Sequence, residues 1–162
     1  MFDPNLLRLA ECVLDKARAQ QLRIATAESC TGGLVAALLT EIAGASDVFE
    51  RGFVVYSNQA KTELLGVSEH VIAAHGAVSE AVACAMAEGA MMNAKTQLSA
   101  AVTGIAGPGG GTAEKPVGLV HISAAREARV LLHERHLFDD FGRNEIRMAS
   151  VEAALKLLLR LL

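Results

Sequence analysis

The chain has 162 residues, of which 52% are hydrophobic and 20% are charged, and its formal net charge at pH 7 is −3. This composition excludes an intrinsically disordered chain and predicts one folded domain over residues 1–162. The weakly negative charge gives no support for binding to nucleic acid. No apolar run reaches the ~20 residues that span a bilayer, and the first residues do not resemble a secretory signal. We therefore expect a cytoplasmic protein without a membrane partner.

Cysteine and histidine form no recognisable disulfide framework or metal site. Cys12, Cys30 and Cys84 are odd in number and widely spaced, which favours free thiols in a cytoplasmic chain. The five histidines show none of the spacings that are typical of metal ligands. We therefore expect no required metal.

Helices and strands are predicted to alternate over most of the chain. Residues 4–20 carry apolar side chains at helical spacing, and residues 22–27 form an apolar run typical of a buried strand. The elements predicted next are a helix at 31–43, a strand at 48–56, a short helix at 59–65, another capped by Ser68, an Ala-rich helix from Ser79 to about residue 94, a strand at 98–103, a hairpin of 117–124 with 128–138, and a final helix at 143–162.

This order of elements predicts an α/β fold, specifically a three-layer α/β/α sandwich with a mixed, mostly parallel sheet. Ligands of such sheets bind at the carboxyl ends of parallel strands. The turns that follow residues 22–27 and 98–103 both lie at such ends, so we expect them to line one pocket.

The first of these turns carries a serine between a strand and a helix, in the segment Glu28-Ser29-Cys30-Thr31-Gly32-Gly33. Backbone N–H groups are unpaired at the start of a helix and the helix dipole is positive there, which suits an oxyanion or a phosphate. The alternative is a plain helix N-cap, because serine and threonine are favoured at that position.

Lys61 is the candidate base for Ser29, since a serine hydroxyl needs a base to act as a nucleophile at neutral pH. Burial or a neighbouring cation would keep its amine partly neutral. Tyr56, the single tyrosine of the chain, could relay a proton or hold the lysine. The alternatives are an exposed helix lysine and a tyrosine that packs on one face of a strand.

The second turn, from Thr103 to Gly111, holds five glycines and Pro108. Glycine permits close approach of the backbone to a ligand and lets N–H groups converge on an anion. The spacing matches neither the dinucleotide-binding fingerprint nor a P-loop. The alternative is a flexible surface loop.

Arg143 and Arg147 are spaced to share one face at the start of the final helix. Two cations at a helix N-terminus oppose its dipole, which a bound phosphate would offset. The alternative is local pairing with Asp139, Asp140 or Glu145.

Taken together, these motifs resemble the C-terminal amidohydrolase domain of the CinA family. The resemblance covers nearly the whole chain, with the motifs in a fixed order. The matching segments are residues 27–33 (AESCTGG), 56–61 (YSNQAK), 75–80 (HGAVSE), 103–110 (TGIAGPGG), 115–118 (KPVG) and 142–147, which begins with Gly142-Arg143 and ends with Arg147.

The resemblance implies hydrolysis of the carboxamide of nicotinamide mononucleotide to the acid and ammonia, with no cofactor. It implies Ser29 as nucleophile, Lys61 as general base and Tyr56 as an assisting group. It also implies an oxyanion site of backbone N–H groups near Ser29 and Gly104. The residues expected to bind the substrate are Cys30, Thr31, Gly32, Thr103, Gly104, Gly107, Arg143 and Arg147. Many family members carry an additional N-terminal domain, which we do not expect here because the first helix begins so early.

Two other readings of the chain stay open at this point. One is a catalytically silent domain of the same family that binds a nucleotide or phosphate. The other is an interaction domain that uses its leucine-rich C-terminus. Residues 155–162 are apolar on more than one helix face, so we expect a homo-oligomer in which a partner subunit covers one of them.

Overall fold

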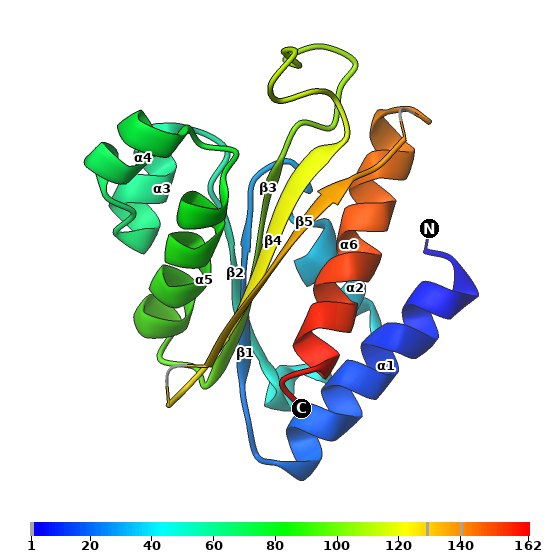
Figure 1. Ribbon diagram of the computed structural model, residues 1–162. Helices are drawn as coiled ribbons and strands as arrows, with labels where there is room; N and C mark the ends of the chain where they lie inside the picture. Colours follow the sequence, from blue (N-terminus) through cyan, green and yellow to red (C-terminus); the bar gives the residue numbers. More distant parts are fainter. Residues whose placement is uncertain (1, 129, 140) are drawn as a thin grey trace.

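A computed structural model describes residues 2–128, 130–139 and 141–162, and within them five strands form one sheet in the order β2-β1-β3-β4-β5 (Figure 1). The strands are β1 (Ile24–Glu28), β2 (Phe49–Val54), β3 (Leu98–Gly104), β4 (Leu119–Arg126) and β5 (Val130–Leu137). β1 pairs in parallel with β2 and β3, and β4 pairs antiparallel with β3 and β5. The predicted mixed sheet is confirmed, and β4 is the strand that runs against the other four.

Helices cover both faces of the sheet, as predicted for a three-layer sandwich (Figure 1). One face carries α1 (Pro4–Ala19), α2 (Leu34–Glu41) and α6 (Arg143–Leu159), and the other carries α3 (Asn58–Leu65), α4 (Glu69–His75) and α5 (Glu80–Ala94). Alternate residues of β1 serve the two layers, because successive side chains of a strand point to opposite faces. Ile24 belongs to the core under α1, α2 and α6, whereas Ala25 and Ala27 belong to the core under α5.

Several predicted boundaries differ from the structure, and one predicted cap is not made. The helix predicted at 31–43 is Leu34–Glu41, and the final helix ends at Leu159 rather than at residue 162. β2 ends at Val54, two residues earlier than predicted, so Tyr56 lies beyond the strand. β4 continues through Arg126, which the sequence had placed in the hairpin turn. Ser68 precedes α4, but its side chain makes no capping hydrogen bond. Ser79 does cap α5, accepting a hydrogen bond from the Val82 N–H.

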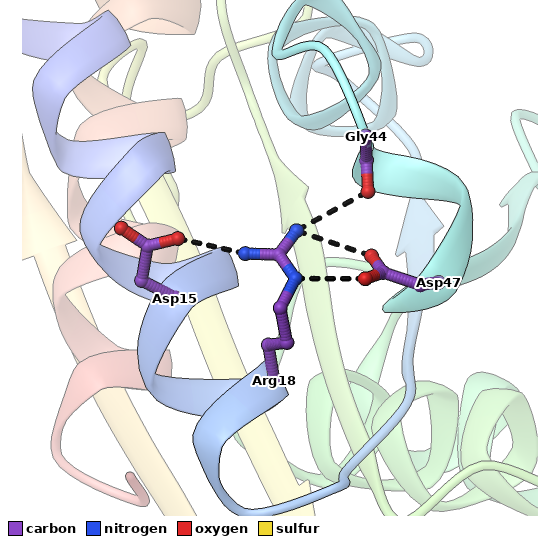
Figure 2. A network of polar contacts seen from close by, with 4 residues as sticks. All are labelled: Asp15, Arg18, Gly44 and Asp47. Carbon is purple, nitrogen blue, oxygen red and sulfur yellow. Dashed lines mark hydrogen bonds and ion pairs between the residues drawn. The ribbon is translucent and has the colours of Figure 1, made fainter.

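Arg18 fastens the end of α1 to the short 3₁₀ helix η1 (Ala45–Asp47), which follows α2 (Figure 2). Its guanidinium donates to both carboxylate oxygens of Asp47, at 2.8 and 3.1 Å, and also to Asp15 and to the Gly44 carbonyl. The hydrogen bond from Arg18 holds the pKa of Asp47 below its usual range. This network lies near the amino ends of β1 and β2, at the opposite end of the strands from the predicted site.

The leucine-rich end of α6 is buried within the chain itself. Leu155, Leu157, Leu158 and Leu161 all lie in the core that α6 shares with α1, α2 and the sheet. These leucines were expected to need a partner subunit to cover one of their faces. That argument is wrong for them, because the chain's own layers cover them. Among the described residues, no helix is both long and apolar enough to cross a membrane.

Candidate active site

A cavity of about 270 Å³ lies at the carboxyl ends of β1 and β3. The long loop that joins β3 to β4 stands at the same end of the sheet (Figure 1). The two predicted turns both reach the cavity, one through Ser29 and Cys30 and the other through residues 103–110. The residues that line it are Ser29, Cys30, Tyr56, Asn58, Lys61, Ala77, Val78, Thr103, Gly104, Ile105, Ala106, Gly107, Gly109, Gly110 and Arg143.

Ser29 follows the last residue of β1 and is buried at the floor of the cavity. Its backbone N–H donates to the Val102 carbonyl at 2.9 Å, so the neighbouring β3 holds it in place. The chain then turns sharply through Gly32 and Gly33, which have φ angles of 60° and 96°. Glycine adopts these left-handed angles without steric cost, which explains the pair at this point of the sequence.

Lys61 reaches Ser29 from α3, and its Nζ lies 3.1 Å from the serine Oγ. The side chain is only 1% exposed, so the alternative of an exposed helix lysine is wrong. Nζ also donates to the carbonyls of Val55 at 3.0 Å and Tyr56 at 3.4 Å. Burial lowers the pKa of the Lys61 amine, because it penalises the charged form.

The electrostatics of Cys30 separate it from its neighbour Ser29. Burial raises the pKa of the Cys30 thiol to about 11, and the nearby Glu28 carboxylate adds to the shift. The thiol is therefore protonated at neutral pH. A protonated thiol is a poor nucleophile, since the thiolate is the reactive form.

Tyr56 and Arg143 meet at the mouth of the cavity. The Tyr56 side chain is 63% exposed, and its hydroxyl accepts a hydrogen bond of 3.2 Å from Arg143 Nη2. Tyr56 contacts Lys61 through its backbone carbonyl. Arg143 also donates to the Gly107 carbonyl at 2.7 Å, which links α6 to the glycine-rich loop. No ion pair of Arg143 occurs among the described residues; Asp140, a predicted partner, lies outside them.

Glu28 is the last residue of β1, and its carboxylate lies at the start of α2, where the sequence predicted a site for an anion or oxyanion. Its buried carboxylate accepts hydrogen bonds from the backbone N–H groups of Gly33, Val35 and Ala36, at 3.1, 3.0 and 2.9 Å. The expected anion site is therefore filled by the chain itself, and a substrate oxyanion must use other donors. Sequence reasoning gave Glu28 no role, although a carboxylate near a helix start is a usable signal.

The glycine-rich loop supplies the opposite wall and further backbone donors. The Ile105 N–H donates to the Leu119 carbonyl, and the Gly118 N–H donates to the Ile105 carbonyl. These two hydrogen bonds close the base of the loop. In the described chain, the N–H groups of Cys30, Ala106 and Gly107 have no backbone acceptor. Thr103 is buried at the end of β3, and its hydroxyl donates to the Ala77 carbonyl at 2.8 Å.

Three residues expected to bind the substrate lie outside the cavity lining. Thr31, Gly32 and Arg147 belong to the layer behind Ser29, where Arg147 Nη2 donates to the Thr31 carbonyl at 2.9 Å. A Cβ at Gly32 would lie 3.3 Å from the same Nη2, so a larger residue there would press on the Arg147 guanidinium. Conversely, Asn58, Ala77 and Val78 line the cavity although no role was predicted for them; they lie inside two of the motifs that carry the resemblance.

A metal site is not evident in the described part of the chain. No group of three or more His, Cys, Asp or Glu side chains there is placed to hold an ion. His121 and His133 do lie together, with Nδ1 and Nε2 3.0 Å apart, but they face α5 rather than the cavity.

Comparison with known proteins identifies relatives over nearly the whole chain. The family model described as the CinA C-terminal domain matches residues 6–162. A CinA-like protein of Syntrophobacter fumaroxidans is 52% identical over 95% of this chain, but the chain spans only 36% of that relative's length. The nicotinamide-nucleotide amidohydrolase PncC of Escherichia coli K12 is 44% identical, over 98% of this chain and 95% of its own length.

Solved structures agree with the sequence relatives. The competence/damage inducible protein CihA of Agrobacterium tumefaciens superposes with a TM-score of 0.98 at 47% identity, covering 99% of this chain and 98% of that one. A CinA superfamily protein of Escherichia coli superposes with a TM-score of 0.93 at 33% identity, covering 100% and 94% of the two chains.

Proposed function

Because this chain belongs to the family of the CinA C-terminal domain, we propose that it is a nicotinamide-nucleotide amidohydrolase. The reaction is hydrolysis of the carboxamide of nicotinamide mononucleotide to the carboxylic acid and ammonia. The observation that carries the proposal is the 3.1 Å contact between Lys61 Nζ and Ser29 Oγ in a cavity at the carboxyl ends of β1 and β3. The amidohydrolase relative that matches at nearly full length supports the same substrate.

The lysine amine is arranged to act as the base. An ammonium has three N–H donors, and Nζ faces three oxygen atoms, those of Ser29, Val55 and Tyr56. When the amine loses a proton, two N–H groups still serve the carbonyls and the lone pair faces the serine hydroxyl. The neutral amine then removes the proton of Ser29 Oγ as that oxygen attacks the carboxamide carbon.

Collapse of the tetrahedral intermediate breaks the C–N bond and transfers the proton from Lys61 to the leaving nitrogen, which departs as ammonia. The acyl group is left as an ester on Ser29. Water then attacks the ester carbonyl while Lys61 accepts its proton, and Ser29 is regenerated as the carboxylic acid leaves. Each step uses the same dyad, which alternates between base and acid.

The oxyanion of the intermediate needs donors other than the start of α2, which Glu28 fills. The N–H of Cys30 and those of Ala106 and Gly107 lie on the two turns that line the cavity. We assign the oxyanion site to these groups, because preorganised backbone donors stabilise the charge that develops on the carbonyl oxygen. Arg143, beside Tyr56 at the mouth, is assigned to the substrate phosphate.

Ammonia release from nicotinamide mononucleotide tests the proposal, with nicotinamide and the intact dinucleotide assayed beside it. We expect release from the mononucleotide by the wild type and none by Ser29→Ala. The alternative function, a silent nucleotide-binding domain, predicts that calorimetry detects binding of the mononucleotide while no ammonia is formed. Absence of both binding and turnover would reject both functions.

A further inference from the structure

The turn between α4 and α5 has four consecutive carbonyls that each accept a hydrogen bond from a side chain. This turn forms part of the cavity wall through Ala77 and Val78. The four bonds are Lys115 Nζ to His75, Ser79 Oγ to Gly76, Thr103 Oγ1 to Ala77 and Lys115 Nζ to Val78, at 2.7, 2.8, 2.8 and 2.8 Å. Ser79 belongs to the turn itself, whereas Thr103 and Lys115 reach it from elsewhere in the chain, so three of the four bonds hold the turn from outside.

Lys115 makes two of these four bonds, and it comes from the far end of the glycine-rich loop. Its own backbone is fixed by Thr112, whose hydroxyl accepts from the Lys115 N–H at 3.0 Å and whose N–H donates to the Lys115 carbonyl at 2.8 Å. The ammonium therefore joins two segments that are separated by nearly 40 residues. Bonds from a charged donor are stronger than those between neutral groups.

Gly76 makes room for the ammonium. A Cβ at this position would lie 2.8 Å from Lys115 Nζ, closer than such atoms approach in proteins, and its φ angle is +77°. The backbone angle calls for glycine, and any side chain here would have to displace the end of the Lys115 side chain. The glycine of one motif and the lysine of another therefore fit each other, and neither has a role in the chemistry derived above.

We propose that Lys115 is a positioning residue that sets the width of the active-site cavity by fastening the glycine-rich loop to the α4–α5 turn. The cavity is bounded by Ala77 and Val78 on the turn and by Ile105 to Gly110 on the loop, and Lys115 ties these two walls together. The consequence for catalysis rests on the proposed amidohydrolase function. Lys115 contacts neither Ser29 nor Lys61, so it acts on how the substrate is held rather than on the dyad.

Kinetics of Lys115→Met and Lys115→Arg test this role. A cavity wall that contacts the substrate equally in the ground state and the transition state affects KM rather than kcat. We therefore expect Lys115→Met to raise KM at least about fivefold and to leave kcat within about twofold of the wild-type value. Arginine can still donate to both carbonyls, so Lys115→Arg should keep most of the wild-type KM. Lys156→Met is the matched control, because Lys156 is an exposed lysine on α6 that pairs only with Glu152 among the described residues.

A double-mutant cycle with Gly76→Ala tests whether the two residues act together. The added methyl group should raise KM in the wild type by displacing the ammonium. In a Lys115→Ala background the ammonium is already absent, so the same change should raise KM by a smaller factor. Equal factors in the two backgrounds would show that Gly76 acts through its backbone angle and not through Lys115.

Hydrogen exchange gives a readout that does not depend on activity. We expect faster amide exchange in residues 75–79 and 105–114 of Lys115→Met, with exchange in β1 and β3 unchanged. Unchanged exchange and KM would overturn the proposal, and faster exchange with unchanged KM would refute the effect on the cavity. If the wild type released no ammonia, the proposed function would fail, while the exchange data would still decide whether Lys115 fastens the loop.

Discussion

Lys61 is the residue on which the proposed chemistry most depends. The amine is removed from water, which lowers its pKa, yet it keeps three oxygen neighbours and so retains a defined position. A charged lysine at such a site is costly unless it is paired, and no carboxylate is within hydrogen-bond reach of its Nζ in the described chain. Burial without a counter-charge is the arrangement that makes a lysine a base near neutral pH.

The pH dependence of the rate should follow the proton on Lys61. Because the folded-state pKa is lowered and the neutral form is active, kcat/KM should rise as pH rises through that pKa, below the ordinary lysine value of about 10.4. Lys61→Arg should be inactive at every pH, because guanidinium stays protonated. An active Lys61→Arg variant, or a rate that falls as pH rises through this range, would exclude Lys61 as the base.

Ser29 and Cys30 are adjacent, and substitution should distinguish them sharply. Ser29→Ala should abolish ammonia release while binding of the mononucleotide persists. Cys30→Ala should stay active, since a thiol with a pKa of about 11 is ionised in roughly one molecule in ten thousand at pH 7. Steady-state assays with calorimetric binding measure both effects. The reverse pattern, an inactive Cys30→Ala and an active Ser29→Ala, would move the nucleophile to Cys30.

At the scale of elements, the starts of α2 and α6 differ in the charged group that each holds. The Glu28 carboxylate accepts hydrogen bonds from three backbone N–H groups at the start of α2. These bonds fix the turn that carries Ser29. The start of α6 instead carries Arg143, and Gly142 before it supplies no side-chain cap. Arg143 contacts Tyr56 and Gly107 across the cavity mouth. At this end of the sheet, the start of α2 is thus closed by Glu28, and the start of α6 carries Arg143, to which we assign the substrate phosphate.

Arg143→Ala should weaken discrimination for the phosphate rather than catalysis in general. Wild type should prefer nicotinamide mononucleotide over its dephosphorylated riboside, and the variant should lose about ten- to a hundredfold of that preference, the value of a hydrogen bond to a charged group. Ratios of kcat/KM for the two substrates measure it. Arg51→Ala, an exposed arginine of β2 outside the cavity, is the control. Undiminished preference in Arg143→Ala would place the phosphate elsewhere.

At the scale of the whole molecule, α6 serves both the site and the core. Its first turn carries Arg143, and its last turns bury leucines against α1, α2 and the sheet. The chain therefore buries its own leucine-rich end, so these leucines no longer argue for a partner subunit. The homo-oligomer stays a prediction. Light scattering at micromolar concentration would decide it.

Leu155→Ala should destabilise the fold by about 2–5 kcal/mol, because it removes a fully buried side chain and leaves a cavity. Leu155 is 0% exposed, whereas Leu64 on α3 is 48% exposed. Leu64→Ala should therefore cost far less. Urea denaturation of the two variants and the wild type measures the difference. Equal losses of stability would mean that the C-terminal helix is less tightly packed than the structure shows.

The sequence by itself determined the order and type of the elements, because periodicity, caps and turn residues act over a few neighbours. It also singled out Ser29, Lys61 and the glycine-rich turn, since strand-to-helix turns and glycine runs are local signals. It did not place the end of β2 at Val54, because a strand ends where its pairing ends, here with β1, and not where its residues alone dictate.

Only the tertiary structure decided which of these residues meet. Lys61 and Ser29 are 32 positions apart, and the parallel pairing of β1 with β2 is what brings α3 over the serine. The same applies to Lys115, whose Nζ donates to carbonyls of the turn before α5, 40 and 37 positions away. Long-range contacts depend on chain folding as a whole, so a local pattern can name such residues but cannot show what they touch.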